Sequence, residues 1–175
     1  MNRNYMNTSF IIFITSCVAI VITLVILLNF NKGTASAMGG VDKVVDEDVF
    51  ARQRKRMVEE QIAYRGVKDK EVLEAMEMVP RHLFIPEENR SYSYYDQPVP
   101  IGFGQTISQP YIVAFMTELL RVGKDDVVLE VGAGSGYQAA ILARLVKQVY
   151  TMEILEELGK EAFMRLKAMG YDNVE

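Results

Sequence analysis

The chain has 175 residues, of which 50% are apolar and 24% charged, and its formal net charge is −4 at pH 7. This composition is that of a globular protein and excludes a disordered or collagen-like chain. Because an acidic protein lacks the basic surface that binds phosphate backbones, nucleic acid is not an expected partner. With one cysteine, Cys17, and one histidine, His82, the chain offers no set of side chains for a Cys- or His-based metal site.

Residues 1–32 are predicted to be a membrane anchor. The run from Phe10 to Leu28 has 19 residues without a charge, enough for one transmembrane helix across a bilayer core of about 30 Å. A cleaved signal peptide is the alternative, because residues 35–37 (ASA) form an A-x-A cleavage site, although the run exceeds the usual roughly 7 to 15 residues. The basic residues after the run favour a single-pass protein whose remaining chain lies on the cytoplasmic side.

Residues 33–51 are predicted to be a flexible tether, since they combine glycines with an acidic cluster at residues 46–48. The basic cluster at residues 52–56 is typical of a solvated helix face or of contact with anionic lipid, and no chemistry is assigned to it.

Two short helices are predicted at the start of the folded part, residues 52–175. Val58 and Ile62 are spaced as on an amphipathic helix that ends at Gly66. Asp69 is typical of the cap of a second helix, which Pro80 ends.

Four of the five prolines lie in residues 80–108, which indicates a shaped loop region with one short hairpin. Long loops in compact domains are more often functional than idle. Pro110 then begins a third helix that Gly123 is expected to end.

The pattern after this helix predicts an α/β fold. A short apolar strand at residues 127–131, a glycine-rich turn, a helix over 137–146 and a second strand at 149–154 form a βαβ unit with parallel strands. We therefore expect part of a doubly wound, Rossmann-like parallel sheet, preceded by an α-helical region and the transmembrane helix. Such sheets normally have five or more strands. We accordingly expect either a truncated chain, the favoured interpretation, or a sheet completed by another chain.

Gly132, Gly134 and Gly136 let the chain turn sharply after the first strand and bring a ligand close to main-chain amides. The turn departs from the dinucleotide fingerprint G-x-G-x-x-G, because Tyr137 occupies the position of that fingerprint's third glycine. In addition, the Glu130 carboxylate would repel a diphosphate. Both departures suit a cationic nucleoside without phosphate, such as S-adenosylmethionine.

Glu153, at the end of the second strand, is placed to accept hydrogen bonds from ribose hydroxyls. Purely structural glycines and a solvated Glu153 carboxylate are the alternatives. A nicotinamide-dependent oxidoreductase is a third, motivated only by the βαβ turn.

Three stretches resemble the protein-L-isoaspartate O-methyltransferase family of class I S-adenosylmethionine-dependent enzymes. They are residues 79–84 (VPRHLF), 98–111 (PVPIGFGQTISQPY) and 128–137 (VLEVGAGSGY), and the resemblance extends over residues 52–175. It implies methyl transfer to the carboxylate of isoaspartyl residues, the first step of repair in damaged proteins. It also implies that Ser108 is the active-site serine and that Gln105, Thr106 and Ile107 lie against the cofactor.

A carboxylate is already ionised near pH 7, so this reaction needs no general base, and rate would come from holding the reactants in line. Without the resemblance, Ser108 is an ordinary hydroxyl at a helix start, and His82 is interpreted as structural. Tyr92, Tyr94 and Tyr95 either line a peptide groove or simply pack. Family members are usually soluble and continue through further strands. The alternative functions are therefore a catalytically silent membrane-tethered fragment or another class I methyltransferase.

Overall fold

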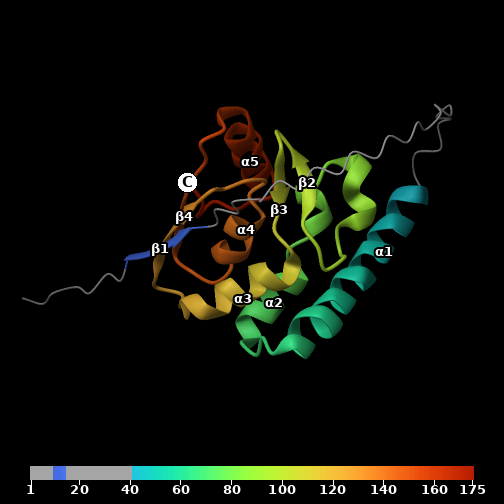
Figure 1. Ribbon diagram of the computed structural model, residues 1–175, viewed down its shortest axis with the longest axis horizontal. Helices are drawn as coiled ribbons and strands as arrows, with labels where there is room; N and C mark the ends of the chain where they lie inside the picture. Colours follow the sequence, from blue (N-terminus) through green and yellow to red (C-terminus); the bar gives the residue numbers. More distant parts are fainter. Residues whose placement is uncertain (1–9, 15–40) are drawn as a thin grey trace, which may run out of the picture.

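The computed structural model describes residues 10–14 and 41–175, which form an α/β structure around one parallel sheet (Figure 1). The strand order is β1-β4-β5, with β1 at Phe10–Ile14, β4 at Val127–Val131 and β5 at Gln148–Met152. Both pairings are parallel, and Val174 adds a parallel bridge to Val149 beyond β5. The parallel pairing of β4 with β5 confirms the predicted βαβ unit.

The core lies on one face of the sheet. Val128 and Val149 are fully buried, whereas their neighbours Leu129 and Tyr150 are partly exposed, as the two-residue period of a strand requires. Two helices follow the strands, α4 at Tyr137–Ala143 and α5 at Glu156–Ala168. Helix α4 begins at the expected residue and ends three residues before the expected end at 146.

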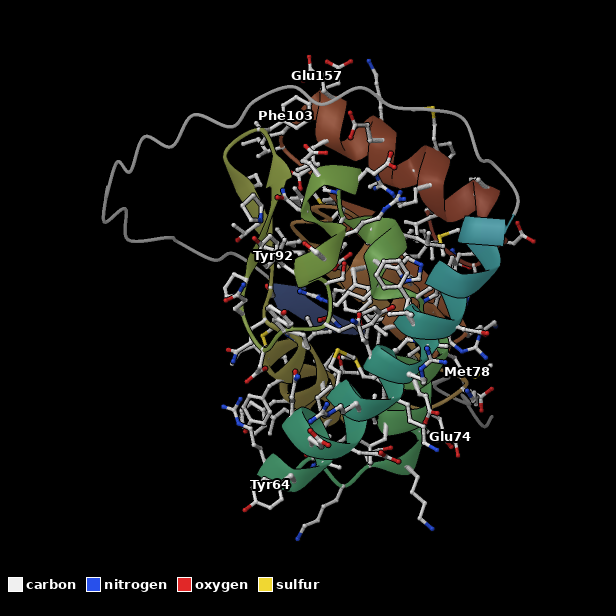
Figure 2. All side chains as sticks on the ribbon, turned by 90° about the vertical axis from the view of Figure 1, so that its right-hand side faces the viewer. Tyr64, Glu74, Met78, Tyr92, Phe103 and Glu157 are labelled. Atoms are coloured by element: carbon white, nitrogen blue, oxygen red, sulfur yellow. The ribbon has the colours of Figure 1, made fainter. Side chains whose placement is uncertain are left out.

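The helical region begins earlier than the sequence predicted. Helix α1 covers Val41–Arg56 and continues through a π-helical stretch, η1 at Met57–Ile62, and a 3-10 turn, η2 at Ala63–Arg65. Residues 41–51, predicted as flexible tether, are therefore helical, and residues 33–40 lie outside the described part of the chain. The physical reason is tertiary: the Phe50 ring stacks on His82 at 4.2 Å. Figure 2 shows Tyr64 projecting from the end of this segment, where its side chain is 87% exposed.

The second and third helices pack beside α1. Helix α2 covers Lys70–Met78, and the Asp69 carboxylate accepts the Glu71 and Val72 N–H groups, which confirms the predicted cap. Helix α3 covers Pro110–Leu120 and ends at Arg121, whose φ is +51°, before the predicted stop at residue 123.

The proline-rich segment between α2 and α3 contains short 3-10 turns and one hairpin. The turns are η3 at Arg81–Phe84 and η4 at Glu87–Tyr92. The antiparallel hairpin joins β2 at Val99–Gly102 to β3 at Gln105–Ile107, which confirms the single hairpin expected there.

The predicted transmembrane helix over Phe10–Leu28 is wrong for its first five residues. Phe10–Ile14 forms β1 and pairs with β4 from Val127 to Val131. A run of Ile and Phe residues suits a strand in a sheet as well as it suits a helix in lipid. Residues 15–28 lie outside the described residues. Within residues 10–14 and 41–175, every helix is too short or too polar to cross a membrane.

Candidate functional site

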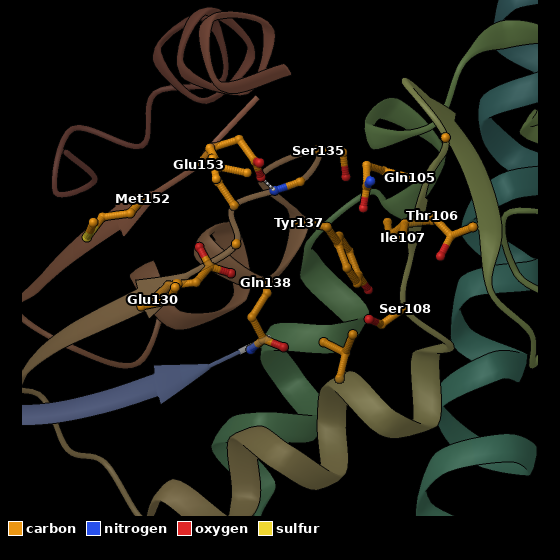
Figure 3. A pocket seen from close by; sticks show the side chains of 17 residues that line it. Gln105, Thr106, Ile107, Ser108, Glu130, Ser135, Tyr137, Gln138, Met152 and Glu153 are labelled. Atoms are coloured by element: carbon orange, nitrogen blue, oxygen red, sulfur yellow. Dashed lines mark hydrogen bonds between the residues drawn. The ribbon is translucent and has the colours of Figure 1, made fainter. Parts of the chain in front are cut away.

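A cavity of about 580 Å³ lies where β4 and β5 end and faces β3 of the hairpin and Ser108, which follows β3. Figure 3 shows Glu130 and Glu153 on the sheet side, with Gln105, Thr106 and Ser108 opposite them. The cavity is lined by Gly104, Gln105, Thr106, Ile107, Ser108, Val113, Glu130, Val131, Gly132, Ala133, Gly134, Ser135, Tyr137, Gln138, Met152, Glu153 and Ile154. Two segments that the sequence analysis selected separately thus meet around one space.

The N–H groups of the glycine turn are already used within the protein. The Gly132 and Ala133 N–H groups both donate to the Met152 carbonyl, at 2.7 and 3.0 Å, and the Gly136 N–H donates to the Ala133 carbonyl at 2.8 Å. A turn that binds a diphosphate presents such N–H groups to the ligand. The geometry therefore disfavours a dinucleotide and agrees with the expectation drawn from Tyr137 and Glu130.

The Glu153 carboxylate holds the turn against the end of β5. Its Oε2 accepts the Gly134 N–H at 2.9 Å, and its Oε1 accepts the Leu155 N–H at 3.1 Å. Each carboxylate oxygen has a second lone pair, so both can still accept a hydroxyl from the cavity. The predicted contact to a ribose is compatible with this position, and the carboxylate also has a structural role that the sequence did not indicate.

Glu130 is fully buried at the base of the cavity. The Thr151 hydroxyl donates to its Oε2 at 2.5 Å, and its Oε1 has no hydrogen-bond partner in the described part of the chain. Burial raises the pKa of Glu130 to about 8, the Thr151 hydrogen bond opposes this rise, and the nearby Glu153 charge adds to it. A cationic ligand would favour the ionised carboxylate, whereas an anionic ligand would meet repulsion.

Gly136 is the one predicted site residue that does not line the cavity. Its φ is +86°, and a Cβ at this position would lie 3.0 Å from Leu166 Cδ1 on α5. The third glycine therefore serves helix packing rather than ligand contact. Gly132 and Gly134, with φ values of +98° and +55°, do line the cavity.

The structure adds Gln138 to the site, a residue that the sequence analysis missed. Its Nε2 donates to Thr117 Oγ1 at 2.8 Å, and the Thr117 hydroxyl donates to the Val113 carbonyl at 2.8 Å. The Thr117 hydroxyl uses its only hydrogen in the bond to the Val113 carbonyl, so the Gln138 amide must turn its NH₂ group toward Thr117. The Gln138 carbonyl oxygen then has no partner in the described residues. In the sequence, only its place directly after Tyr137, at the end of the glycine turn, could have indicated that Gln138 lies at the site.

The aromatic residues of the 80–108 segment divide into two groups. Tyr94 is 4% exposed, and its hydroxyl contacts His82 Nδ1 at 2.7 Å, so it packs and does not line a groove. Tyr92 and Tyr95 are exposed and meet edge to face. His82 is buried, which lowers its pKa and agrees with the structural role predicted for it.

A cavity with apolar walls, a buried carboxyl and a second carboxylate at the strand end suits a cationic ligand with ribose-like hydroxyls. The residues present therefore fit the expected S-adenosylmethionine. Gln105, Thr106 and Ile107 line the opposite wall of this cavity, and their contact with the cofactor stays a prediction.

Comparison with known proteins gives a consistent result. A profile of the protein-L-isoaspartate(D-aspartate) O-methyltransferase family matches residues 52–175. A protein-L-isoaspartate O-methyltransferase of Synechococcus sp. is 59% identical over 128 residues, which cover 73% of this chain and 52% of that protein. A protein-L-isoaspartate O-methyltransferase 2 of Nitrosococcus oceani is 63% identical over 107 residues, 61% of this chain and 49% of that protein.

A solved structure of a protein-L-isoaspartate O-methyltransferase superposes with a TM-score of 0.56 at 28% identity, covering 73% of this chain and 40% of that one. The chain thus spans about half the length of the curated relatives it matches.

Proposed function

This chain belongs to the protein-L-isoaspartate(D-aspartate) O-methyltransferase family, and on that premise we propose that it methylates the carboxylate of L-isoaspartyl residues in damaged proteins, using S-adenosylmethionine. The observation that carries the proposal is that one cavity is lined by both the glycine turn and the segment containing Ser108. A methyl donor and an acceptor carboxylate must meet in one space, and this arrangement supplies it.

The residues of the glycine turn and of β5 would hold the cofactor. Glu153 is placed to accept ribose hydroxyls, Glu130 lies where a positive charge is favoured, and Gly132 and Gly134 allow close approach to the main chain. When bound, S-adenosylmethionine supplies an electrophilic methyl group on a sulfonium. The cavity wall formed by Gln105, Thr106 and Ile107 would exclude water from the opposite side.

Ser108 would orient the acceptor. Ser108 directly follows β3 and lies two residues before the start of α3. Its side chain lies at the cavity (Figure 3). A hydroxyl can donate one hydrogen bond to a substrate carboxylate and so aim its second oxygen at the methyl group. The acceptor is ionised near pH 7, so no residue of the chain is required to remove a proton.

The test is transfer of a labelled methyl group to a peptide that contains one isoaspartyl residue, with the same peptide containing ordinary aspartate as the substrate control. Ser108→Ala should lower kcat about 10- to 100-fold, while the cofactor Kd changes less than about threefold. Ser91→Ala, at an exposed serine outside the cavity, is the matched control and should behave as the unmodified chain.

Each other outcome of this assay supports a different function for the chain. Cofactor binding without transfer would support the catalytically silent fragment, which the chain's span of about half its relatives makes a specific alternative. Transfer to another acceptor with none to the isoaspartyl peptide would indicate a different class I methyltransferase. Tight binding of a nicotinamide dinucleotide would overturn the proposal.

We also propose membrane association through the apolar N-terminal run, with the folded part on the cytoplasmic side. The support is the uncharged stretch from residue 10 to 28. The pairing of β1 with β4 uses five residues of that stretch, so strand pairing and a full-length span compete for the same residues. Flotation with anionic vesicles tests the proposal; recovery of the chain entirely in the lipid-free fraction would contradict it.

A further inference from the structure

We infer that Arg81 is a positioning residue for methyl transfer and acts through Ser108; this inference rests on the function proposed above. Arg81 does not line the cavity, and neither the glycine turn nor the segment around Ser108 indicates a role for it. The inference comes from what its guanidinium group contacts.

Arg81 is a buried cation that forms no salt bridge with the side chains described in residues 47–175. Its side chain is fully buried, and Asp96 is near enough for its charge to act on the guanidinium group. Burial lowers its pKa, because the protein interior solvates the charge less well than water does. Placing a charge in the interior without a salt-bridge partner is unfavourable, so an apolar side chain would serve a purely structural contact better.

The guanidinium group joins three segments, two of which line the cavity. Its Nη2 donates to the Ser108 carbonyl at 2.7 Å, and its Nε donates to the Ser93 carbonyl at 2.8 Å. Its Cζ lies 4.9 Å from the ring centroid of Tyr137, the residue that follows the glycine turn. Since the donors of arginine lie in one rigid plane, these contacts fix the three segments relative to one another.

The contact to Ser108 is the one that bears on the reaction. A hydrogen bond to the Ser108 carbonyl fixes the peptide plane between Ser108 and Gln109 and so limits rotation of the Ser108 backbone. Gln109 is held on its other side, where its Nε2 donates to the Asp96 carbonyl at 3.0 Å. An error of about 1 Å in the direction of the Ser108 hydroxyl is enough to cost about 100-fold in rate.

A double-mutant cycle in the full chain tests the inference, with Arg81→Met, Ser108→Ala and the double variant as its members. Alone, Arg81→Met should lower kcat about 10- to 100-fold and change the cofactor Kd less than about threefold. In the Ser108→Ala background it should lower kcat less than about threefold, because the residue through which it acts is gone. Arg81→Lys keeps a charged donor and should recover part of the loss.

Arg54→Met is the matched control. Arg54 also donates to a main-chain carbonyl, that of Glu77 at 2.6 Å, and to the Tyr94 hydroxyl, but it contacts neither Ser108 nor Tyr137 in the described structure. Its kcat should stay within about threefold of the unmodified chain in both backgrounds.

The outcomes separate this inference from the proposed function. If the unmodified chain transfers no methyl group, the proposed function fails and the inference fails with it. If the unmodified chain is active and the cycle is additive, or kcat is unchanged, only the role of Arg81 fails. If both Arg81 variants lose cooperative unfolding, Arg81 is a structural residue and the inference is overturned.

Discussion

Glu130 and Thr151 lie opposite each other on the neighbouring strands β4 and β5, and the Thr151 hydroxyl donates to the Glu130 carboxyl at 2.5 Å. This single donor does not offset the burial of the carboxyl, whose pKa is raised to about 8. A glutamic acid at the base of the cavity is therefore mostly protonated near pH 7 while no cation is bound. Two predictions concern this group.

The first prediction concerns the pH dependence of stability. Below pH 4.5 Glu130 is protonated in both the folded and the unfolded chain, whereas between pH 4.5 and about 8 only the folded chain keeps the proton. The free energy of unfolding should therefore fall as pH rises through this window, by on the order of 3 to 5 kcal/mol. Urea unfolding without cofactor should show this fall relative to Glu130→Gln, which is neutral throughout.

Glu74→Gln is the control, since Glu74 is an exposed carboxylate on α2. Its unfolding profile should stay within about 0.5 kcal/mol of the unmodified chain at every pH. Parallel profiles for the unmodified chain and Glu130→Gln would contradict the buried, protonated state of Glu130.

The second prediction concerns protons released by cofactor binding. A sulfonium near Glu130 should lower its pKa, so binding of S-adenosylmethionine between pH 6 and 7 should release up to about one proton. Calorimetry in phosphate and in Tris measures this as a difference in the apparent binding enthalpy. S-adenosylhomocysteine, which lacks the sulfonium charge, should release less, and Glu130→Gln should release none; an equal enthalpy in both buffers for the unmodified chain would refute the prediction.

The third prediction concerns Gly136. A methyl group there would meet Leu166 Cδ1 at 3.0 Å and Ala162 Cβ at 3.5 Å, and φ is +86°. Gly170 has a similar φ, +79°, with no atom within 4 Å of an added Cβ, so Gly170→Ala isolates the cost of backbone strain. That strain should cost both variants about 1 kcal/mol, and Gly136→Ala should lose about 1 to 3 kcal/mol more.

Urea or thermal unfolding at a fixed pH compares the two glycine variants. Equal losses of stability would mean that α5 shifts freely away from the turn.

The fourth prediction concerns the docking of α1. The rings of Phe50 and His82 are stacked at 4.2 Å with an angle of 14° between their planes, and Phe50 is partly buried. Phe50→Ala should reduce the free energy of unfolding by about 1 to 3 kcal/mol, because the ring loses its apolar contacts. Tyr64→Ala, at a ring that is 87% exposed, should change it by less than about 0.5 kcal/mol. Equal effects of the two variants would show that α1 does not depend on this contact.

The sequence by itself determined the elements whose cause is local. An apolar strand followed by three glycines predicts β4 and its turn, Asp69 and Pro80 mark the ends of α2, and Pro110 marks the start of α3. Of the nine site residues that the sequence proposed, eight line the cavity, because their residue types and spacing along the chain carry the signal.

The tertiary structure decided what depends on residues far apart in the chain. Phe10–Ile14 is a strand because β4 offers it a partner, and α1 begins before residue 52 because Phe50 meets His82. Gly136 faces Leu166 rather than the cavity, and Arg81 reaches Ser108. Periodicity and capping report only on neighbours along the chain, whereas these features result from contacts that form when distant segments pack.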